Sequence, residues 1–189
     1  MTTPRSEPPP AVVVAIGGPI GVGKSTVARG LAERLGIPCI SAGGVFRQVA
    51  TRRGLSVVEL NRFAEDDPTI DRDLDRLQGE LAKAGPCVVE SRLSGWMVAA
   101  DLKVWLDAPL EIRAARVAGR EGKVSDEARQ ELLVRERSEW SRYKALYGIE
   151  ITDRSPYQLV VDTSRWDPDV IIEVLVHLAR AVRPVSRAR

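Results

Sequence analysis

The chain has 189 residues, and its 28 Lys and Arg against 26 Asp and Glu leave a net charge of only +2, which excludes the strong basic excess typical of nucleic-acid-binding proteins. Hydrophobic residues make up 44% of the chain, a share that fits a globular protein and excludes bulk disorder. No apolar stretch approaches the ~20 residues that a membrane-spanning helix needs. We therefore expect neither a nucleic acid nor a membrane among its partners.

The ends of the chain differ in composition from its middle. Residues 1–10, MTTPRSEPPP, are polar and proline-rich and predict a disordered leader, and residues 183–189 predict a flexible tail. Between them, residues 11–182 are expected to form a single domain. The two cysteines lack metal-ligand spacing and a CxxC pattern, which indicates reduced thiols and a cytoplasmic location.

Short apolar segments alternate with segments of helical periodicity along the whole domain. The apolar segments predict strands over residues 12–16, 37–40, 87–90, 102–106 and 158–162. The periodic segments predict helices over residues 27–35, 45–53, 57–64, 68–84, 110–119, 126–147 and 168–182. This alternation is typical of an α/β fold in which a five-stranded parallel sheet carries helices on both faces.

A phosphate-binding loop is the strongest motif in the chain. The stretch GPIGVGKS at residues 18–25 matches the pattern GxxxxGK[ST], and it lies between a predicted strand and a predicted helix, as a P-loop requires. Glycines let the backbone N–H groups turn toward phosphates, Lys24 reaches the β- and γ-phosphates, and Ser25 binds Mg²⁺. The predicted ATP or GTP site consists of Gly18, Gly21, Val22, Gly23, Lys24, Ser25 and Thr26, with Lys24 also catalytic.

The P-loop alone does not define the reaction, because GTPases, motor ATPases and small-molecule kinases share it. The chain has no NKxD motif for reading guanine, which argues against a GTPase. A nucleotide-binding regulator without turnover remains an alternative from a different class.

Two further segments predict a second anion site. The stretch SAGGVFR at residues 41–47 leaves the second strand through glycines, so that Ala42 and Gly43 can offer backbone N–H groups and Arg47 follows one turn later. After the third strand, Glu90 could hold Mg²⁺ through water and Arg92 could bind an anion. A helix-capping turn and a surface ion pair are the alternatives for these two segments.

Arginines recur in the region that follows the fourth strand. Helical spacing puts Arg113, Arg116 and Arg120 on one face, and a second face carries Arg135, Glu139 and Arg142. Arginines carried on a mobile segment can neutralise a transferring phosphoryl group and exclude water. A solvated helix face with pairs such as Arg135–Glu139 is the alternative.

An ordered series of stretches resembles the nucleoside monophosphate kinases, and specifically the archaeal-type cytidylate kinases. The series spans residues 12–178 and comprises GGPIGVGKST, ISAGGVFRQVATRRGLS, DPTIDRDLDRLQ, VVESRLSGWM, LKVWLDAPLEIRAARVAGREGK, RERSEWSRYKALYGIEI and VVDTSRW. The resemblance implies a P-loop core with a monophosphate-binding helical insert over about 43–84 and a lid over about 119–142. It also implies transfer of a phosphoryl group from ATP, with Mg²⁺, to CMP or dCMP.

The resemblance further implies a role for each matching residue. Arg47 and Arg92 would hold the acceptor phosphate beside Ala42 and Gly43, and Glu139 would contact the acceptor sugar. Arg116 would stack on adenine, while Arg120, Arg135 and Arg142 would reach the phosphates during transfer. Asp71 would lie near the pyrimidine ring, although an acidic residue in a first helical turn can equally well balance the helix dipole. We expect a monomer.

Two positions depart from the family pattern near the acceptor. Gly44 stands where an acidic residue is usual, and Ser91 stands where glycine is more common. Neither change removes a phosphate ligand, but both leave the identity of the acceptor open. A related P-loop kinase acting on a modified nucleotide or another small molecule is therefore the alternative.

Overall fold

The computed structural model describes residues 10–183, and within this range it leaves the side chains at positions 48, 57, 58, 61, 65, 66 and 74 undescribed. The predicted leader and tail fall outside this range except for one residue each, so both stay predictions. Among the described residues, no helix combines the length and apolar character needed to cross a membrane.

Five parallel strands form the centre of the fold. They are β1 (Val13–Gly17), β2 (Cys39–Ser41), β3 (Cys87–Glu90), β4 (Leu102–Asp107) and β5 (Leu159–Asp162). Their order across the sheet is β2-β3-β1-β4-β5, and each neighbouring pair is parallel. Each predicted strand is found with bounds shifted by at most 2 residues, because each is a short apolar run between segments of helical periodicity.

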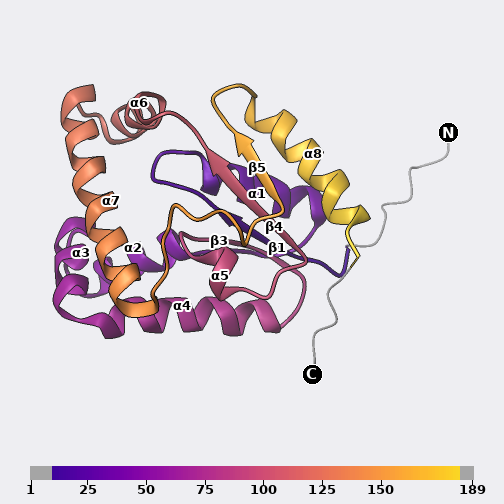
Figure 1. Ribbon diagram of the computed structural model, residues 1–189, viewed down its shortest axis with the longest axis horizontal. Helices are drawn as coiled ribbons and strands as arrows, with labels where there is room; N and C mark the ends of the chain where they lie inside the picture. The colour runs from indigo at the N-terminus through magenta and orange to yellow at the C-terminus, as the bar shows by residue number, and fades with distance from the viewer. Residues whose placement is uncertain (1–9, 184–189) are drawn as a thin grey trace.

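Helices cover both faces of this sheet (Figure 1). On one face, α1 (Lys24–Leu35) and α8 (Pro168–Ala181) bury Leu31 and Leu175 against Val14 and Ile16 of β1. On the other face, Val13 and Ala15 of β1 lie in a cluster with Ala82 and Val98, which come from the chain on either side of β3. Successive strand side chains point to opposite faces, so β1 supplies both cores and is buried along its whole length.

Three helices between β2 and β3 occupy the region that the sequence predicts as an insert. They are α2 (Ala42–Arg52), α3 (Val57–Asp66) and α4 (Pro68–Lys83). They share a small core of Ala50, Leu60, Ala64 and Ile70. A capping box between Ser56 and Glu59 starts α3, and the side chain of Asp67 accepts a hydrogen bond from Thr69 N–H to start α4.

Two helices follow β4, and the lid predicted over about 119–142 covers the end of the first and most of the second. They are α6 (Leu110–Glu121) and α7 (Ser125–Tyr147), which pack against each other through Val117, Ala118, Ala128 and Leu132. In Figure 1, α7 runs from beside α6 toward the insert helices at the same side of the molecule. It therefore lies beside both the core and the insert.

Two local features differ from the sequence-based expectation. Helix α2 begins at Ala42 rather than at position 45, because the Ser41 hydroxyl accepts a hydrogen bond from Gly44 N–H at 3.1 Å and caps the helix early. The capping turn and the proposed anion-binding turn are thus the same turn. The short helix α5 (Ser94–Met97) was not predicted, because 4 residues are too few to show a period.

Candidate active site

The carboxyl ends of the five strands meet at one edge of the sheet, where α/β folds place their ligands. This edge carries Gly17, Ser41, Glu90, Asp107 and Asp162, the last residues of the strands in chain order. The P-loop leaves the central strand β1 at this edge and enters α1 at Lys24. Most of the predicted site residues therefore come from one side of the molecule.

The P-loop backbone depends on its glycines. Gly18, Gly21 and Gly23 have positive φ angles of 142°, 77° and 97°, which side chains disfavour. A Cβ atom on Gly18 would lie 2.4 Å from the carbonyl oxygen of Leu106, and one on Gly21 would lie 2.6 Å from that of Arg113. A Cβ on Gly23 would meet nothing within 4 Å. The loop thus rests on β4 and α6, with open space at Gly23, beside the N-terminus of α1 that favours an anion.

Lys24 folds back over its own loop. Its Nζ atom donates hydrogen bonds to the carbonyl oxygens of Gly18 and Pro19, both at 2.8 Å. Burial, followed by the nearby charge of Arg92, lowers the pKa of Lys24 to about 7, while the Glu90 and Glu139 carboxylates act in the opposite direction. The lysine is therefore poised to gain a full charge when phosphates approach.

A carboxylate and two hydroxyls form a cluster of oxygen atoms beside the P-loop. The Ser25 hydroxyl donates to Glu90 Oε1 at 2.8 Å, and the Ser41 hydroxyl donates to the same atom at 2.5 Å. Glu90 itself is only 3% exposed. Mg²⁺ prefers oxygen ligands such as hydroxyl and carboxylate groups. In phosphoryl-transfer sites it takes few ligands from the protein. The pair Ser25–Glu90 therefore fits the predicted metal.

Arg92 connects the P-loop to the lid helix. Its Nε atom lies 2.7 Å from Glu139 Oε2 on α7, and its Nη1 atom donates to the carbonyl oxygen of Gly18 at 3.0 Å. Both partners of this ion pair are mostly buried, with 15% and 13% of their side chains exposed. The ion pair named as the alternative for Arg92 exists, but it is buried at the P-loop rather than on the surface.

A second buried ion pair connects the lid helix to the insert. Arg142 Nε on α7 donates to Asp71 Oδ2 on α4 at 2.8 Å, and Arg142 Nη1 donates to the Ser138 hydroxyl at 2.6 Å. Burial raises the pKa of Asp71, while the Arg142 charge and hydrogen bond oppose the rise. Asp71 lies in the first turn of α4, as predicted, but its partner is an arginine 71 residues away and not only the helix dipole.

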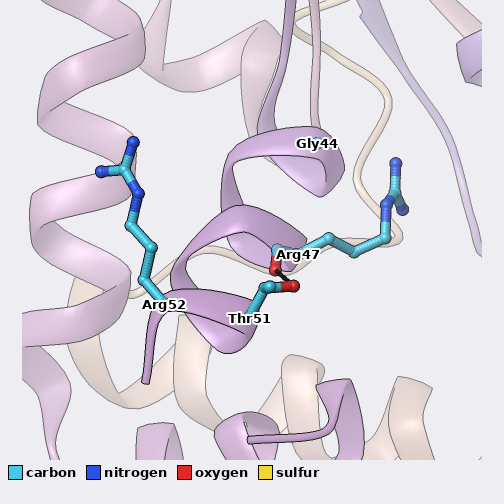
Figure 2. Close-up of a pocket in the computed structure, with 4 residues that line it drawn as sticks. All are labelled: Gly44, Arg47, Thr51 and Arg52. Carbon is cyan, nitrogen blue, oxygen red and sulfur yellow. Dashed lines mark hydrogen bonds between the residues drawn. The ribbon is translucent and has the colours of Figure 1, made fainter. Parts of the chain in front are cut away.

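Arg47 lines a pocket of about 470 Å³ on α2 together with Gly44, Thr51 and Arg52. Figure 2 shows the side chains of Arg47 and Arg52 extending to opposite sides of the helix. The guanidinium of Arg47 lies back toward the helix start, where a Cβ atom on Gly43 would be 3.5 Å from its Nη1 atom. Arg47 is thus adjacent to Gly43, its predicted neighbour at the acceptor site, while it stays exposed.

The remaining predicted lid arginines do not form one group. Arg116 donates to the carbonyl oxygen of Val22 at 3.3 Å and to the hydroxyl and carbonyl oxygens of Thr163 at 2.9 and 2.8 Å. Arg120 is paired with its neighbour Glu121 at 2.6 Å. No described ion pair joins Arg135 to Glu139, because Glu139 pairs with Arg92, and Arg135 contributes its charge near Glu121. The roles of Arg116, Arg120 and Arg135 toward ATP stay predictions.

Arg113 corrects the grouping expected from helical spacing. It is only 8% exposed, and its guanidinium donates to backbone carbonyl oxygens of Ala108 and Ile20 and to Glu136 Oε1. Arg113 is therefore buried against the P-loop, whereas Arg120 and also Arg116, which reaches Val22 of the loop, are exposed residues. A helical repeat shows which residues share a stripe, but it does not show which of them is buried.

Known proteins match this chain over nearly its whole length. The sequence model of the cytidylate kinase-like family matches residues 13–165. The chain belongs to this family. It is 48% identical over 176 residues to the cytidylate kinase of Natronomonas pharaonis, with 92% of each chain covered, and 44% identical over 182 residues to that of Pyrococcus furiosus, with 96% of this chain and 95% of the other covered.

Solved structures show the same fold for this member of the cytidylate kinase-like family. Shikimate kinase from Bacteroides thetaiotaomicron aligns with a TM-score of 0.60 at 16% identity, over 88% of this chain and 97% of that one. Shikimate kinase from Acinetobacter baumannii aligns with a TM-score of 0.57 at 17% identity, over 89% and 92% of the two chains. At such low identity these structures establish the P-loop kinase fold alone.

In this cytidylate kinase-like chain, the sequence reasoning missed Glu136, Ser138, Thr163 and Tyr157. Glu136 Oε1 accepts a hydrogen bond from the P-loop N–H of Ile20 at 3.0 Å. Thr163 lies in the loop after β5, and its hydroxyl donates a hydrogen bond to the carbonyl oxygen of Val22 at 2.9 Å. Glu136 and Ser138 lie within the quoted stretch RERSEWSRYK, so the signal was present, but nothing in that stretch indicates which element they face.

Proposed function

We propose that the protein transfers the γ-phosphoryl group of ATP to CMP or dCMP and forms ADP and the corresponding diphosphate. The observation that carries the proposal is identity of 43–48% over most of the chain to proteins named cytidylate kinase. The grouping of Lys24, Ser25, Glu90 and Arg92 at the P-loop supports it, since these are the charges and oxygen donors that phosphoryl transfer needs.

ATP would occupy the P-loop. The backbone N–H groups of Gly21, Val22 and Gly23 and the side chain of Lys24 would surround its phosphates, with Thr26 close behind. Ser25 and Glu90 would hold Mg²⁺, which neutralises charge between the β- and γ-phosphates when it is bound. Lys24 would exchange its carbonyl partners for phosphate oxygens, a change that favours its charged form. Arg116 would border the adenine from α6.

The acceptor would bind on the insert side. Arg92 and Arg47 would hold its phosphate, and the N-terminal turn of α2 at Ala42 and Gly43 would add backbone donors. Glu139 orients Arg92 through their buried ion pair and would also reach the sugar. Gly44 and Ser91, the two positions that depart from the family pattern, lie in this region. Gly44 is in the first turn of α2. The buried Ser91 hydroxyl has no hydrogen-bond partner among the described residues.

The lid would supply the remaining charges. Arg120, Arg135 and Arg142 would approach the transferring group, which carries most of its charge on oxygen atoms. Arg142 is paired with Asp71 in the structure. A phosphate that attracts Arg142 would therefore free the Asp71 carboxylate for another partner, and the exocyclic amine of cytosine is a donor that a carboxylate accepts. Contact with the phosphoryl group and recognition of the base would then be linked through one ion pair.

An ADP-release assay against CMP, dCMP, UMP, AMP and GMP tests the proposed function. CMP and dCMP should be the best acceptors, because UMP presents a carbonyl where cytosine presents an amine. Lys24→Ala should reduce turnover by about 10²–10³, the usual cost of one lost charge-stabilising contact. A wild-type protein that phosphorylates no pyrimidine monophosphate would overturn the proposal in favour of another small-molecule acceptor.

Asp71→Asn tests base recognition separately from the reaction. We expect the ratio of kcat/KM for CMP over UMP to fall by roughly tenfold or more, mainly through lost CMP activity, since a mismatched buried hydrogen-bonding group costs about 1–3 kcal/mol. Asp73→Asn on the same helix is the matched control, because the Asp73 side chain is 72% exposed and its ion pair, with Arg76 at 3.5 Å, lies on the surface of that helix. An unchanged ratio in Asp71→Asn would remove Asp71 from the base site.

A further inference from the structure

The P-loop residue Ile20 is packed against α6 and α7. Its side chain is 4% exposed and packs in the cluster formed by Val117, Ala118, Ala128 and Leu132 of α6 and α7. Its N–H donates to Glu136 Oε1 on α7 at 3.0 Å, and its carbonyl oxygen accepts from Arg113 Nη1 on α6 at 3.0 Å. Both backbone polar groups of this P-loop residue are thus paired with side chains of α6 and α7.

The two side chains that hold Ile20 are also bound to each other. Arg113 Nη1 lies 2.6 Å from the same Oε1 atom of Glu136, and Arg113 Nε donates to the carbonyl oxygen of Ala108. The side chain of Arg113 is 10% exposed and that of Glu136 is 26% exposed. The backbone of Arg113 also touches the loop, since its carbonyl oxygen would be 2.6 Å from a Cβ atom on Gly21. Arg113 is therefore fixed to the loop, and Glu136 is an α7 side chain that bonds directly to the loop backbone.

We propose that Glu136 is a positioning residue that fixes the orientation of the Ile20 amide, and through it the P-loop N–H groups that bind ATP phosphates. The inference rests on the proposed function in that the ligand of this loop is ATP. An amide network binds a phosphate tightly only when its donors already point inward, because reorienting them consumes binding energy. A lid helix bound directly to the loop backbone makes this preorganisation depend on where α7 lies.

A purely structural ion pair and a positioning role make different demands on the side chain. Glu136→Asp is one methylene shorter, and because the same Oε1 atom contacts Ile20 N–H and Arg113, it should lose both contacts. Glu136→Gln loses the charge but keeps an acceptor oxygen at the same distance from the amide. Positioning therefore predicts that Gln works and Asp fails, whereas an ion-pair role predicts that both fail.

The test is the affinity for Mg²⁺·ATP measured by calorimetric titration without any acceptor. Glu136→Asp should weaken ATP binding by about ten- to a hundredfold, as the loss of a buried hydrogen bond implies, while Glu136→Gln should stay within about threefold of the wild type. Glu131→Asp and Glu131→Gln are matched controls on the same helix, since Glu131 pairs with Lys123 at 2.5 Å and is not bonded to the P-loop. Both controls should bind ATP like the wild type.

Three results would overturn the inference: wild-type ATP affinity in Glu136→Asp, a loss in Glu136→Gln as large as in Glu136→Asp, or equal losses in the Glu131 controls. Thermal melting of each variant shows that the titrated protein is folded at the temperature used. Because no acceptor is present, these outcomes do not depend on whether CMP is the substrate. With the acceptor added, the KM for CMP should change by less than about twofold, since Ile20 faces the lid and not the insert.

Discussion

Lys24 illustrates how the free protein prepares a charged residue for an anion. Its ammonium group is held by two carbonyl oxygens, near a second cation, Arg92, and inside a buried site. Burial disfavours the charged form, so the pKa falls to about 7 from the ordinary 10.5. Bringing the negative phosphates of ATP to this site reverses the balance, because the charged form then has a strong partner.

We predict that ATP binding at pH 8 takes up protons from solution. At that pH a lysine with a pKa of about 7 is mostly neutral, and the phosphates should raise its pKa enough to charge it. Calorimetric titration of Mg²⁺·ATP in two buffers that differ in ionisation enthalpy measures the number of protons, which should approach roughly one. At pH 6 the uptake should be small, because Lys24 is already charged.

The control for proton uptake is Lys24→Ala, which should abolish most of it at pH 8. The same pKa shift also makes the stability of the folded protein depend on pH. The unfolded chain binds the Lys24 proton more tightly than the folded one, so this residue makes the free energy of unfolding rise as pH increases from about 7 to 10.5. Equal proton uptake in wild type and Lys24→Ala would show that another group titrates.

At the scale of elements, α7 is the helix that joins the parts of the site. Glu136 contacts the P-loop, Glu139 pairs with Arg92 after β3, and Arg142 pairs with Asp71 on α4. Tyr147 also donates to Asp75 on α4 at 3.0 Å, where burial raises the pKa of Asp75 to about 6. This polar face of α7 contacts the P-loop, Arg92 and α4, so it is not the solvated helix face that the sequence left open as an alternative.

The sequence predicted the elements better than their pairings. The P-loop and all five strands follow from local patterns, and the structure confirms them. The partners of Arg113, Glu139 and Arg142 are separated from them by 23 to 71 residues. Helical spacing reports only neighbours three or four residues apart, so it could not identify these pairs.

Helix α2 offers a matched test of the predicted acceptor site. Arg47 and Arg52 line the same pocket but extend to opposite sides of the helix (Figure 2). We predict that Arg47→Ala raises the KM for CMP by about tenfold or more, since a charge-assisted hydrogen bond to phosphate contributes roughly 1.5–3 kcal/mol. Arg52→Ala should leave it within about twofold. The KM for ATP should be unaffected in both variants.

Initial rates with CMP varied at saturating ATP, and then with ATP varied at saturating CMP, separate the two substrates. If both arginine variants bind CMP equally well, the acceptor phosphate does not lie on this face of α2. A loss confined to the ATP dependence would instead move Arg47 to the donor side of the site.

At the scale of the whole molecule, Tyr157 packs between α5, β4 and the end of β1, and we call this packed region the floor of the site. The loop after α7 returns Tyr157 to the sheet, where its hydroxyl lies 3.3 Å from Gly95 N–H at the start of α5. The rings of Trp96 and Trp105 pack edge-on against it, with centroids 5.5 and 5.2 Å away. This packing places the lid's return loop against the end of β1, just before the P-loop.

Two glycines make that packing possible, and the sequence did not indicate either of them. A Cβ atom on Gly17 would lie 2.2 Å from the Tyr157 hydroxyl oxygen, and one on Gly95 would lie 2.4 Å from Tyr157 Cζ. Neither glycine has a positive φ, so neither is required by backbone conformation. Both are required by contact with Tyr157, which is 62 residues from Gly95 and still further from Gly17, a separation that no local pattern encodes.

We predict that Gly95→Ala destabilises the whole molecule, because the tyrosine ring is enclosed by two tryptophans and cannot move aside. Overpacking of this kind costs about 1–3 kcal/mol in the free energy of unfolding. Gly119→Ala is the matched control, since Gly119 lies in helix α6 with nothing within 4 Å of an added Cβ, and alanine there should stabilise by about 0.5–1 kcal/mol. Urea denaturation of both variants measures the difference. If Gly95→Ala unfolds at the wild-type midpoint, Tyr157 has room to move, and the floor of the site is less tightly packed than these contacts indicate.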